Sequence, residues 1–313
     1  DGDVLDKFCG LWFEYSDNEE INIRLKQDIS SIPSFKFLPW INQITSRLYT
    51  ENTTFQKTLQ LTLKRVLYKL PYESLYSVIS MKLHKKYDSS NDPSITARVS
   101  AVEKIFKELE TFENGRFVTD FINPILEFCE NCVELACTKK FNQRSRNLEL
   151  KNLTIGDYWL NRLKLAGIPL PTVPFKITCS GDGRAGRPTI VGIVGTVEIS
   201  SSGLSLPKIV TFQLSDGSRH KVLMKGSNDD LRQDAIMEQV FKQVNKILLR
   251  NKETRKRGLR IRTYEVIPLG PQAGLLEFVA NSIPLHDILC TLHKNDEMSF
   301  DQARKAMRAV QTK

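Results

Sequence analysis

The stretch KVLMKGSNDDLRQD, residues 221–234, places a lysine at the end of an apolar strand and a group of acids directly behind it. Lys225 follows three apolar residues, and the acids come next: Asp229, Asp230 and Asp234. Two interpretations are open. Lys225 is either a strand-end lysine that reaches for solvent, or a cation held for a ligand and balanced by a carboxylate.

The length, composition and charge of the chain limit the possible folds and partners. It has 313 residues, of which 41% are hydrophobic, and a net charge of +9, so about two globular domains and acidic partners are expected. Six irregularly spaced cysteines favour a reducing compartment, and Cys129, Cys132 and Cys137 are predicted to pack on or near a helical core. No apolar run reaches the roughly 18–20 residues of a membrane span, so no membrane partner is expected.

The first half of the chain is predicted to be helical. Apolar residues recur at close to helical spacing in IPSFKFLPWINQITSRLYT and in TTFQKTLQLTLKRVLYKLP, where Pro71 marks the end. Three further helical segments follow: YESLYSVISMKLHKKY, ITARVSAVEKIFKELETF and FVTDFINPILEFCENCVELACTKKF. Short connections predict antiparallel helix pairs, which stack into a solenoid when each pair buries its face on the next.

After the proline cluster IPLPTVPF the pattern changes to short β segments. They are TIVGIVGTVEI, KIVTFQL, SRHKVLM, LRIRTYEVIPL and GLLEFVA. Asp216-Gly217 is a strong hairpin signal between two of them. One helix with an apolar face, from Asp229 to Arg250, interrupts the strands. The expected order is β-β-β-α-β-β, a small and mostly antiparallel sheet with an inserted helix, and helical pattern returns after it.

Two glycine- or serine-rich loops differ in what they indicate. Gly181, Gly183 and Gly186 match G-x-G-x-x-G, but a proline-rich segment precedes them and a strand follows, so we interpret them as a loop and not as a dinucleotide fingerprint. The loop SSSGLSLPK, residues 200–208, lies between two predicted strands, one hairpin before Lys225. Small residues allow backbone amides and hydroxyls to approach an anion, although a polar hairpin loop has the same composition.

A strand lysine with an acid on the following helix suits nucleotide chemistry. In phosphotransferases such a lysine contacts the phosphates and is held by that acid. Asp229 and Asp230 are also explained as helix-capping acids, because the helix dipole favours negative charge there. Asp234, one turn further along, is less easily explained as a cap and is the preferred partner of Lys225.

The exact residues of these segments narrow the possible functions to one family. LMKGSNDDLRQDAIMEQVF, RNKETRKRGLRIRTYEVIPL and GLLEFV closely resemble the kinase N-lobe of the phosphatidylinositol-3-kinase-related protein kinases, and most of all its ATM/Tel branch of checkpoint kinases in the fungal Tel form. FKFLPWINQITSRL and LYKLPYESLYSVISM resemble the closing helical repeats of the FAT domain that precedes this kinase. The resemblance spans nearly the whole chain, and its motifs concentrate in residues 200–285.

The resemblance implies an ATP site. Lys225 would bind the phosphates, with Asp234 as its partner and Asp230 nearby. The loop over the phosphates and the walls and hinge of the adenine pocket would come from Ser202, Leu206, Pro207, Leu223, Tyr264, Glu277, Phe278 and Val279. Two features depart from the family: Phe278 stands where tryptophan is frequent, and the interval from Lys225 to the acids is one residue longer, which leaves the second acid open between Asp229 and Asp230.

The resemblance also implies an activity and its partners. We expect an ATP- and Mg-dependent serine/threonine protein kinase of nuclear DNA-damage and telomere signalling, which phosphorylates serine or threonine before glutamine. Protein substrates, a DNA-end-sensing complex, the remainder of its own chain and a second copy are the implied partners. Alternatives are a lipid kinase N-lobe and a helical scaffold with a pseudokinase lobe. No catalytic-loop or DFG-like string occurs, so the catalytic base and metal ligands are expected beyond Lys313, and this segment alone should be inactive.

The expected fold is an α-helical, solenoid-like segment followed by an α+β protein-kinase-like N-lobe and the start of a helical C-lobe. We predict the end of the FAT repeats in residues 1–165, the N-lobe in 166–283 and the first C-lobe helices in 284–313. The basic run RNKETRKRGLRIR is interpreted as a solvated connector from the N-lobe helix to the next strand, although it would also suit a nuclear signal or nucleic acid.

Overall fold

The chain forms two compact units, Asp1–Phe278 and Val279–Lys313. The predicted boundaries after residues 165 and 283 separate family domains and not compact units, and they stay predictions. A computed structural model describes residues 2–51, 53–87, 92–139, 147–149, 159, 162, 164–175, 186–200, 206–226, 231–271, 273–294 and 298–311.

The first half is helical, as predicted, and its helices begin where the sequence supplies caps. Asn18, Thr53 and Asp92 accept hydrogen bonds from backbone N–H groups of the first turns of α2, α4 and α6. Pro71 ends one helix and starts the next, because its missing N–H is needed by neither. The helices are α1 (Gly2–Glu14), α2 (Glu19–Ser31), α3 (Ile41–Ser46), α4 (Thr54–Lys69), α5 (Pro71–Tyr87), α6 (Pro93–Leu109) and α7 (Asn123–Cys137).

The helix expected from IPSFKFLPWINQITSRLYT is divided in two. Residues Ser34–Trp40 form a 3-10 helix, η1, and α3 begins only after it. Pro39 lies inside η1, where it removes a backbone donor and prevents a regular α-helix from running through. A second irregularity precedes α7, where 3-10 turn η2 (Phe112–Gly115) leads to π-helix η3 (Val118–Ile122).

An antiparallel sheet in the order β1-β3-β4-β5-β7-β6 forms mainly from the second half of the chain, and β2 also pairs with β4. Its strand β1 comes from residues predicted to be helical. The predicted hairpin forms between β4 and β5, with Gly217 at φ +84° and the side chain of Asp216 accepting from the amide of Ser218. The strands are β1 (Asn147–Leu148), β2 (Ile190–Ile193), β3 (Val197–Ile199), β4 (Lys208–Leu214), β5 (Arg219–Gly226), β6 (Val266–Pro268) and β7 (Ala273–Glu277).

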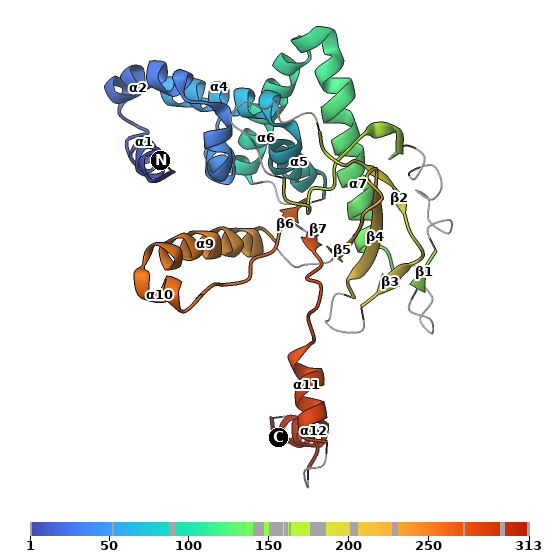
Figure 1. The fold of residues 1–313 in the computed structure, drawn as a ribbon. Coiled ribbons are helices and arrows are strands. Elements are labelled where there is room, and N and C mark those ends of the chain that lie inside the picture. The colour runs from blue at the N-terminus through green and yellow to red at the C-terminus, as the bar shows by residue number, and fades with distance from the viewer. Residues whose placement is uncertain are drawn as a thin grey trace. The chain divides into compact units, whose positions relative to one another are not determined.

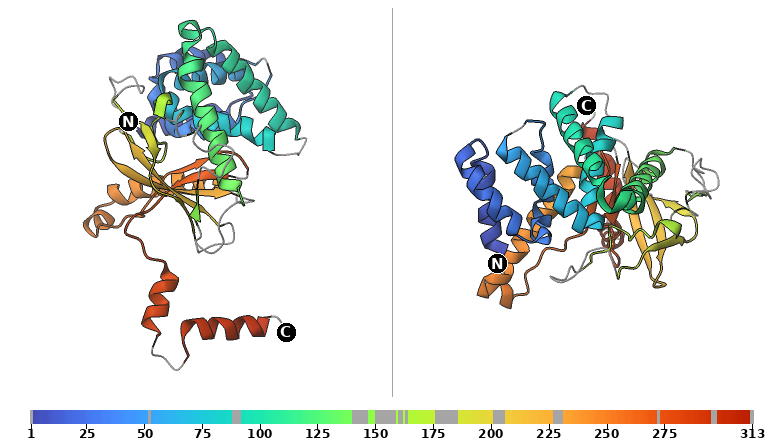
Figure 2. Two further views of the ribbon diagram at one scale, coloured as in Figure 1. Left: turned by 90° about the vertical axis from the view of Figure 1, so that its right-hand side faces the viewer. Right: turned by 90° about the horizontal axis from the view of Figure 1, so that it is seen from above.

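α7 joins the helices to the sheet. It contacts α5 on one side and β5 and β7 on the other, as Figures 1 and 2 show. Seven of its side chains are buried, including Phe128, Cys129 and Cys132, whereas Cys137 at its end is exposed. One continuous hydrophobic core runs from Trp12 in α1 to Leu275 in β7. The helical half and the sheet therefore share their interior.

α9 (Leu231–Arg250) follows β5, and the short α10 (Lys252–Lys256) leads from it toward β6. The expected strand LRIRTYEVIPL is wrong over most of its length, because only Val266–Pro268 pairs in the sheet. Side chains of α9 hold the preceding residues instead. Asn245 donates to the carbonyl of Ile261 and accepts from its amide, at 2.9 and 2.8 Å.

The second unit contains α11 (Leu285–Leu292) and α12 (Phe300–Gln311). Among the described residues of the chain, no helix has the length and apolar character needed to cross a membrane.

Candidate nucleotide site

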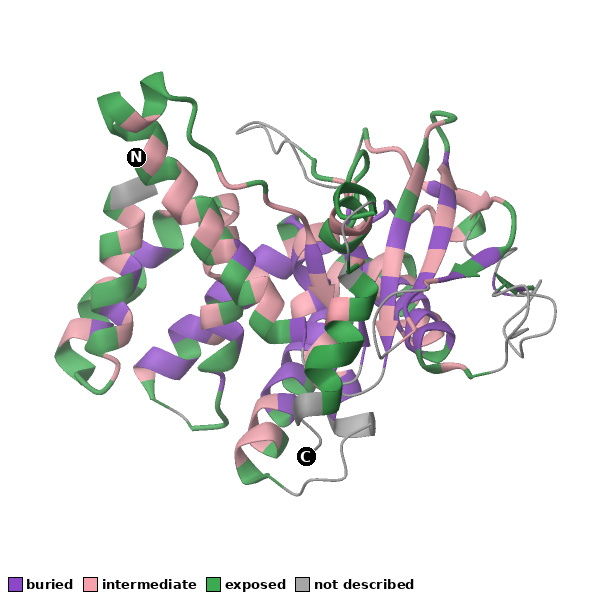
Figure 3. Cartoon of the chain, turned by 90° about the horizontal axis from the view of Figure 1, so that it is seen from below, coloured by how far each residue is buried: buried purple, intermediate pink, exposed green. Residues whose placement is uncertain are grey.

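Side chains of β5 (Arg219–Gly226) point alternately to two faces of the sheet, and the two faces differ in burial. Val222, Met224 and Gly226 are buried on the face that α7 covers, whereas Leu223 and Lys225 are only half-buried on the other face. Figure 3 shows this alternation along the strands. Lys225 therefore projects from the side of the sheet that does not face the main core.

Lys225 and Asp234 lie beside each other. Lys225 Nζ is 4.0 Å from Asp234 Oδ2, and the two side chains are 28% and 44% exposed. The sequence predicted this pairing, and the structure brings the two residues together. An ion pair this open to water contributes little to stability, of the order of 0–1 kcal/mol. The charges stay accessible to a ligand.

Close packing of α9 on the sheet produces this geometry. Lys225 pairs with Gly274 on β7, and a Cβ atom at Gly274 would lie 2.6 Å from Leu231 Cδ1 and 2.8 Å from the carbonyl oxygen of Ile267. Glycine at this position leaves room for the backbone of β6 and for the Leu231 side chain from the first turn of α9. Asp234, one turn further along the same helix, is thereby carried to Lys225.

An apolar cluster lies on the same face of the sheet. Leu231, Val266 and Leu276 are buried, and Leu223 and Tyr264 are partly buried against them. Burial raises the pKa of Tyr264, and the carboxylates of Glu238 and Asp234 raise it further. The predicted pocket-wall residues Leu223 and Tyr264 are therefore neighbours in one cluster, which Asp234 approaches.

The predicted hinge begins at the end of β7. Glu277 Oε1 accepts from Arg262 Nη2 at 2.8 Å, and Glu277 Oε2 accepts from the amide of Glu265 at 3.1 Å. The amide of Phe278 donates to the carbonyl of Lys221 at 3.4 Å, and Lys221 Nζ lies 5.6 Å from the centre of the Phe278 ring. These contacts fix the last strand residue and the first hinge residue to the sheet.

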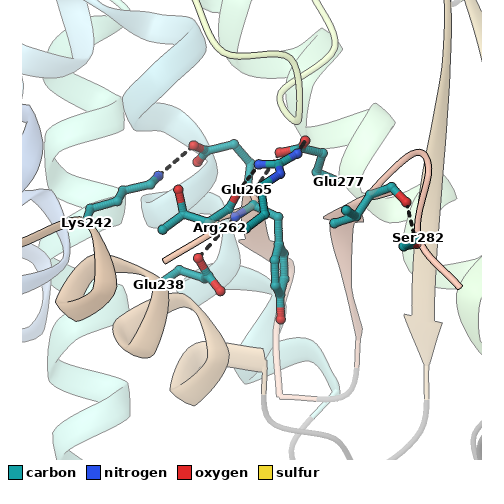
Figure 4. A network of polar contacts seen from close by, with 9 residues as sticks. Glu238, Lys242, Arg262, Glu265, Glu277 and Ser282 are labelled. Carbon is teal, nitrogen blue, oxygen red and sulfur yellow. Dashed lines mark hydrogen bonds and ion pairs between the residues drawn. The ribbon is translucent and has the colours of Figure 1, made fainter. Parts of the chain in front are cut away.

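Val279 belongs to the second unit. Its carbonyl accepts a hydrogen bond from Ser282 Oγ at 2.8 Å, drawn in Figure 4. Its predicted role against the adenine stays a prediction.

The predicted phosphate loop is described only at its edges. Ser202, Asp229 and Asp230 lie outside the described residues. Leu206 has φ +46° and packs against the main core, and the buried Pro207 accepts a backbone hydrogen bond from Ser200 at 2.8 Å. Neither belongs to the cluster around Leu223, so their assignment to the nucleotide stays a prediction.

A polar network that the sequence did not predict ties α9 to the segment before β6 (Figure 4). The buried Glu238 accepts from the amide of Tyr264 at 3.1 Å, and Lys242 Nζ donates to Glu265 Oε1 at 2.6 Å. Arg262 completes it through its contact with Glu277. Glu238 lies four residues after Asp234, so helical spacing alone would have placed both acids on neighbouring turns of one face.

These residues fit a phosphate-bearing ligand better than a metal. The site offers a cation, one carboxylate engaged with it, and an apolar wall. A magnesium ion needs several oxygen ligands, and Asp234 is the one carboxylate paired with Lys225 among the described residues. Lys225 is therefore suited to the phosphates of a nucleotide, and the apolar cluster to its base.

Sequence comparisons place the chain among known proteins. Residues 221–312 match the family model described as phosphatidylinositol 3- and 4-kinase. The chain is 58% identical over all 313 residues to the serine/threonine-protein kinase TEL1 of Saccharomyces cerevisiae, and 59% identical over 312 residues to that of Kluyveromyces lactis. It spans 11% of the length of each of these relatives.

Solved structures agree with this similarity. The chain aligns over 98% of its length with 12% of a chain in the structure of the open conformation of CtTel1, with a TM-score of 0.89 and 34% identity. It aligns over its whole length with 13% of a chain in the Tel1 kinase butterfly symmetric dimer, with a TM-score of 0.88 and 56% identity. Another similar structure, at a TM-score of 0.86, covers the FAT and kinase domain of CtTel1. The helical segment and sheet thus match a FAT segment and a kinase N-lobe.

Proposed function

The chain belongs to the Tel-type branch of the phosphatidylinositol-3-kinase-related protein kinases, and from this premise we propose that it forms the ATP-binding lobe and adjoining helical scaffold of an ATP-dependent serine/threonine protein kinase. One observation carries the proposal. Lys225 and Asp234 lie 4.0 Å apart on the open face of the sheet, beside the apolar cluster of Leu223 and Tyr264.

Each residue has a chemical task in this proposal. Lys225 neutralises charge on the phosphates, and Asp234 holds the lysine in place while it waits for them. Leu223 and Tyr264 exclude water from one side of the adenine. The backbone after β7 supplies polar groups to the adenine edge, and the contacts of Glu277 and Phe278 hold that backbone still. Magnesium would offset the negative charge of the phosphates when bound, and the residues that would hold it are expected outside this site.

The first test measures ATP affinity. Lys225→Met removes the cation and should weaken ATP binding by roughly 10–100-fold, the cost of about one charge-assisted hydrogen bond. Asp234→Asn should weaken it less, because the lysine remains but loses its partner. Lys104→Met, on the exposed side of α6, is the matched control and should bind ATP as the wild type does. Calorimetric titration with ATP of the wild-type chain and of each variant gives the comparison.

Unchanged ATP affinity in Lys225→Met, with the control also unchanged, would remove the basis for the proposed site. In the longer kinase that the proposal implies, Lys225→Ala should abolish phosphoryl transfer while circular dichroism shows that the helical half stays folded. Undiminished transfer in that variant would contradict the role given to Lys225.

The proposal extends to substrates and setting. We propose protein substrates with serine or threonine before glutamine, a place in nuclear DNA-damage and telomere signalling together with a DNA-end-sensing complex, and a homodimeric assembly. The kinase names of the relatives support the protein-kinase activity, and two similar structures are of Tel1 dimers. The signalling setting, the nuclear location and the Ser/Thr-Gln preference rest on the family resemblance.

A lipid kinase is the second candidate, because the matching family model is described by phosphatidylinositol substrates. The two are separated by offering the longer kinase a peptide with Ser-Gln, the same peptide with Ser-Ala, and phosphatidylinositol vesicles. Phosphorylation of the Ser-Gln peptide alone is expected. Transfer to the vesicles and to neither peptide would favour the lipid kinase.

A further inference from the structure

Three side chains with metal-binding atoms converge where α11 meets α12. His286 and Cys290 lie one turn apart on α11, and Asp301 is the second residue of α12. His286 Nε2 is 3.5 Å from Cys290 Sγ and 3.9 Å from Asp301 Oδ1. The three ligand atoms all lie within 4.8 Å of one another.

These separations are close to those of a tetrahedral zinc site. Zinc bonds of about 2.0–2.3 Å to nitrogen, oxygen and sulfur place neighbouring ligand atoms roughly 3.3–3.8 Å apart. Nε2 of His286 contacts Asp301 and is the ring nitrogen nearer to Cys290 Sγ, at 3.5 Å against 3.8 Å for Nδ1. The spacing of four residues on a helix is common among zinc-binding pairs. The third pair, Cys290 Sγ and the Asp301 carboxylate, lies within 4.8 Å, so a contraction of up to about 1 Å would close the set around one ion.

Within this segment of the chain, large apolar side chains of α11 and α12 are exposed. Leu285, Leu292 and Met307 are 69%, 70% and 68% exposed, and neither α11 nor the described side chains of α12 include a buried residue. The His286–Asp301 contact is open to water, with side chains 43% and 58% exposed, so it contributes little. A metal held by both helices would add stability to their contact.

The ligand types select the ion. Imidazole, thiolate and carboxylate together suit zinc, whereas magnesium and calcium require oxygen ligands. We propose that His286, Cys290 and Asp301 bind one zinc ion, which fixes α11 to α12 and leaves a fourth position for water or a further ligand. Cys290 binds as the thiolate, and its proton is released to the buffer. The site is independent of the proposed ATP-binding function.

The test uses cobalt as a spectroscopic substitute for zinc. The metal-free chain is titrated with Co²⁺, which gives a thiolate-to-cobalt charge-transfer band when sulfur is a ligand and intense visible bands when the geometry is tetrahedral. We expect both, at one equivalent, and their loss when one equivalent of Zn²⁺ is added. Cys290→Ser should remove the charge-transfer band. His286→Ala and Asp301→Asn should each weaken binding by more than the roughly 10–100-fold that loss of an outer ligand partner costs.

Matched controls use a cysteine and a histidine outside the cluster. Cys137→Ser changes the exposed cysteine at the end of α7, and His293→Ala changes the residue after the last turn of α11. Both should keep the wild-type spectrum. No charge-transfer band in the wild type, or a band that survives Cys290→Ser, would overturn the proposal. A band lost in Cys137→Ser would assign the metal elsewhere and overturn it equally.

A second measurement reports the structural effect without an optical signal. Amide hydrogen exchange in α11 and α12 should slow when Zn²⁺ is added to the metal-free wild type, and should not change in Cys290→Ser. Exchange that is equally slow with and without zinc in the wild type would contradict a metal that fixes the two helices.

Discussion

Two helices that pack on the sheet, α7 against β5 and β7 and α9 against β6, have become different kinds of structure. α7 buries seven of its fifteen residues between α5 and the sheet. α9 is longer, at twenty residues, yet only Leu231 and Glu238 are buried in it. Both are amphipathic in sequence. The difference teaches that an apolar face identifies a helix but does not say how far the helix is buried. α7 is enclosed between α5 and the sheet, whereas α9 carries Asp234, the proposed partner of Lys225, on an open face.

The largest expected effect belongs to α7. Phe128 is fully buried and contacts the rings of Tyr76, Trp159 and Phe212. Phe128→Ala should lower the free energy of unfolding by roughly 3–5 kcal/mol, as truncation of a core aromatic does. Val240→Ala on α9 is the comparison, because Val240 is 46% exposed, and it should change stability by no more than about 0.5 kcal/mol. Urea denaturation of both variants measures the contrast, and equal losses would erase the distinction between the helices.

A smaller loss is expected where α7 touches β5. A Cβ atom at Gly226 would lie 2.4 Å from the carbonyl oxygen of Ala136 and 2.9 Å from the amide nitrogen of Cys137, both backbone atoms of α7. Gly226→Ala should therefore cost at least the upper part of the roughly 1–3 kcal/mol typical of overpacking, since neither strand nor helix can yield easily.

The control for this variant is another strand glycine. Gly192 in β2 has open space around its Cβ position, so Gly192→Ala should leave the free energy of unfolding nearly unchanged or raise it slightly. If both alanines were tolerated alike, the contact between α7 and β5 would be looser than the structure indicates.

The smallest effect is a dependence on pH. Lys208 in β4 is 4% exposed, and its Nζ donates to the carbonyl of Ala136 in the last turn of α7 at 2.5 Å. Burial lowers the pKa of Lys208 below its ordinary value of 10.5. Between the lowered folded pKa and 10.5 the unfolded chain holds more protons than the folded chain, so stability rises with pH in this window.

Lys208→Met should remove that contribution. The difference in unfolding free energy between wild type and variant should therefore shift in favour of the wild type as pH rises toward 10.5. The comparison with the variant is needed because burial raises the pKa of Cys129, which acts in the opposite direction. A difference that stays constant with pH would show that Lys208 titrates alike in both states.

Much of the site could be predicted because its signals are local. A strand of alternating residues, a lysine at its end and an acid one turn into the next helix already predicted that Lys225 and Asp234 would meet. The network of Glu238, Lys242 and Arg262 could not be predicted in the same way. Glu238 and Lys242 lie on α9, and their partners in the segment before β6 depend on how α9 packs against that segment.

The errors have physical causes as well. The segment that leads to β6 carries β-type residues, but its backbone bonds to Asn245 and Glu238 of α9 in place of a neighbouring strand. The helix expected through Pro39 was divided because spacing of apolar residues does not register a missing backbone donor. In the first case, hydrogen bonds to α9 outweighed the strand preference of the segment. In the second, the proline ring prevented the regular helix that the apolar spacing favoured.

The sequence by itself determined the change from helices to a sheet with an inserted helix, the hairpin at Asp216-Gly217, the resemblance to a kinase family, and the pairing of a strand lysine with a helix acid. Periodicity, turn chemistry and short-range spacing encode all of these. The sequence did not predict β1, or that TIVGIVGTVEI divides into β2 and β3. Only the tertiary structure decided that α7 would be enclosed and α9 left open, and that His286, Cys290 and Asp301 would converge. Such arrangements depend on which surfaces pack together. The apolar faces of α7 and α9 differ in burial because the face of α7 packs between α5 and the sheet.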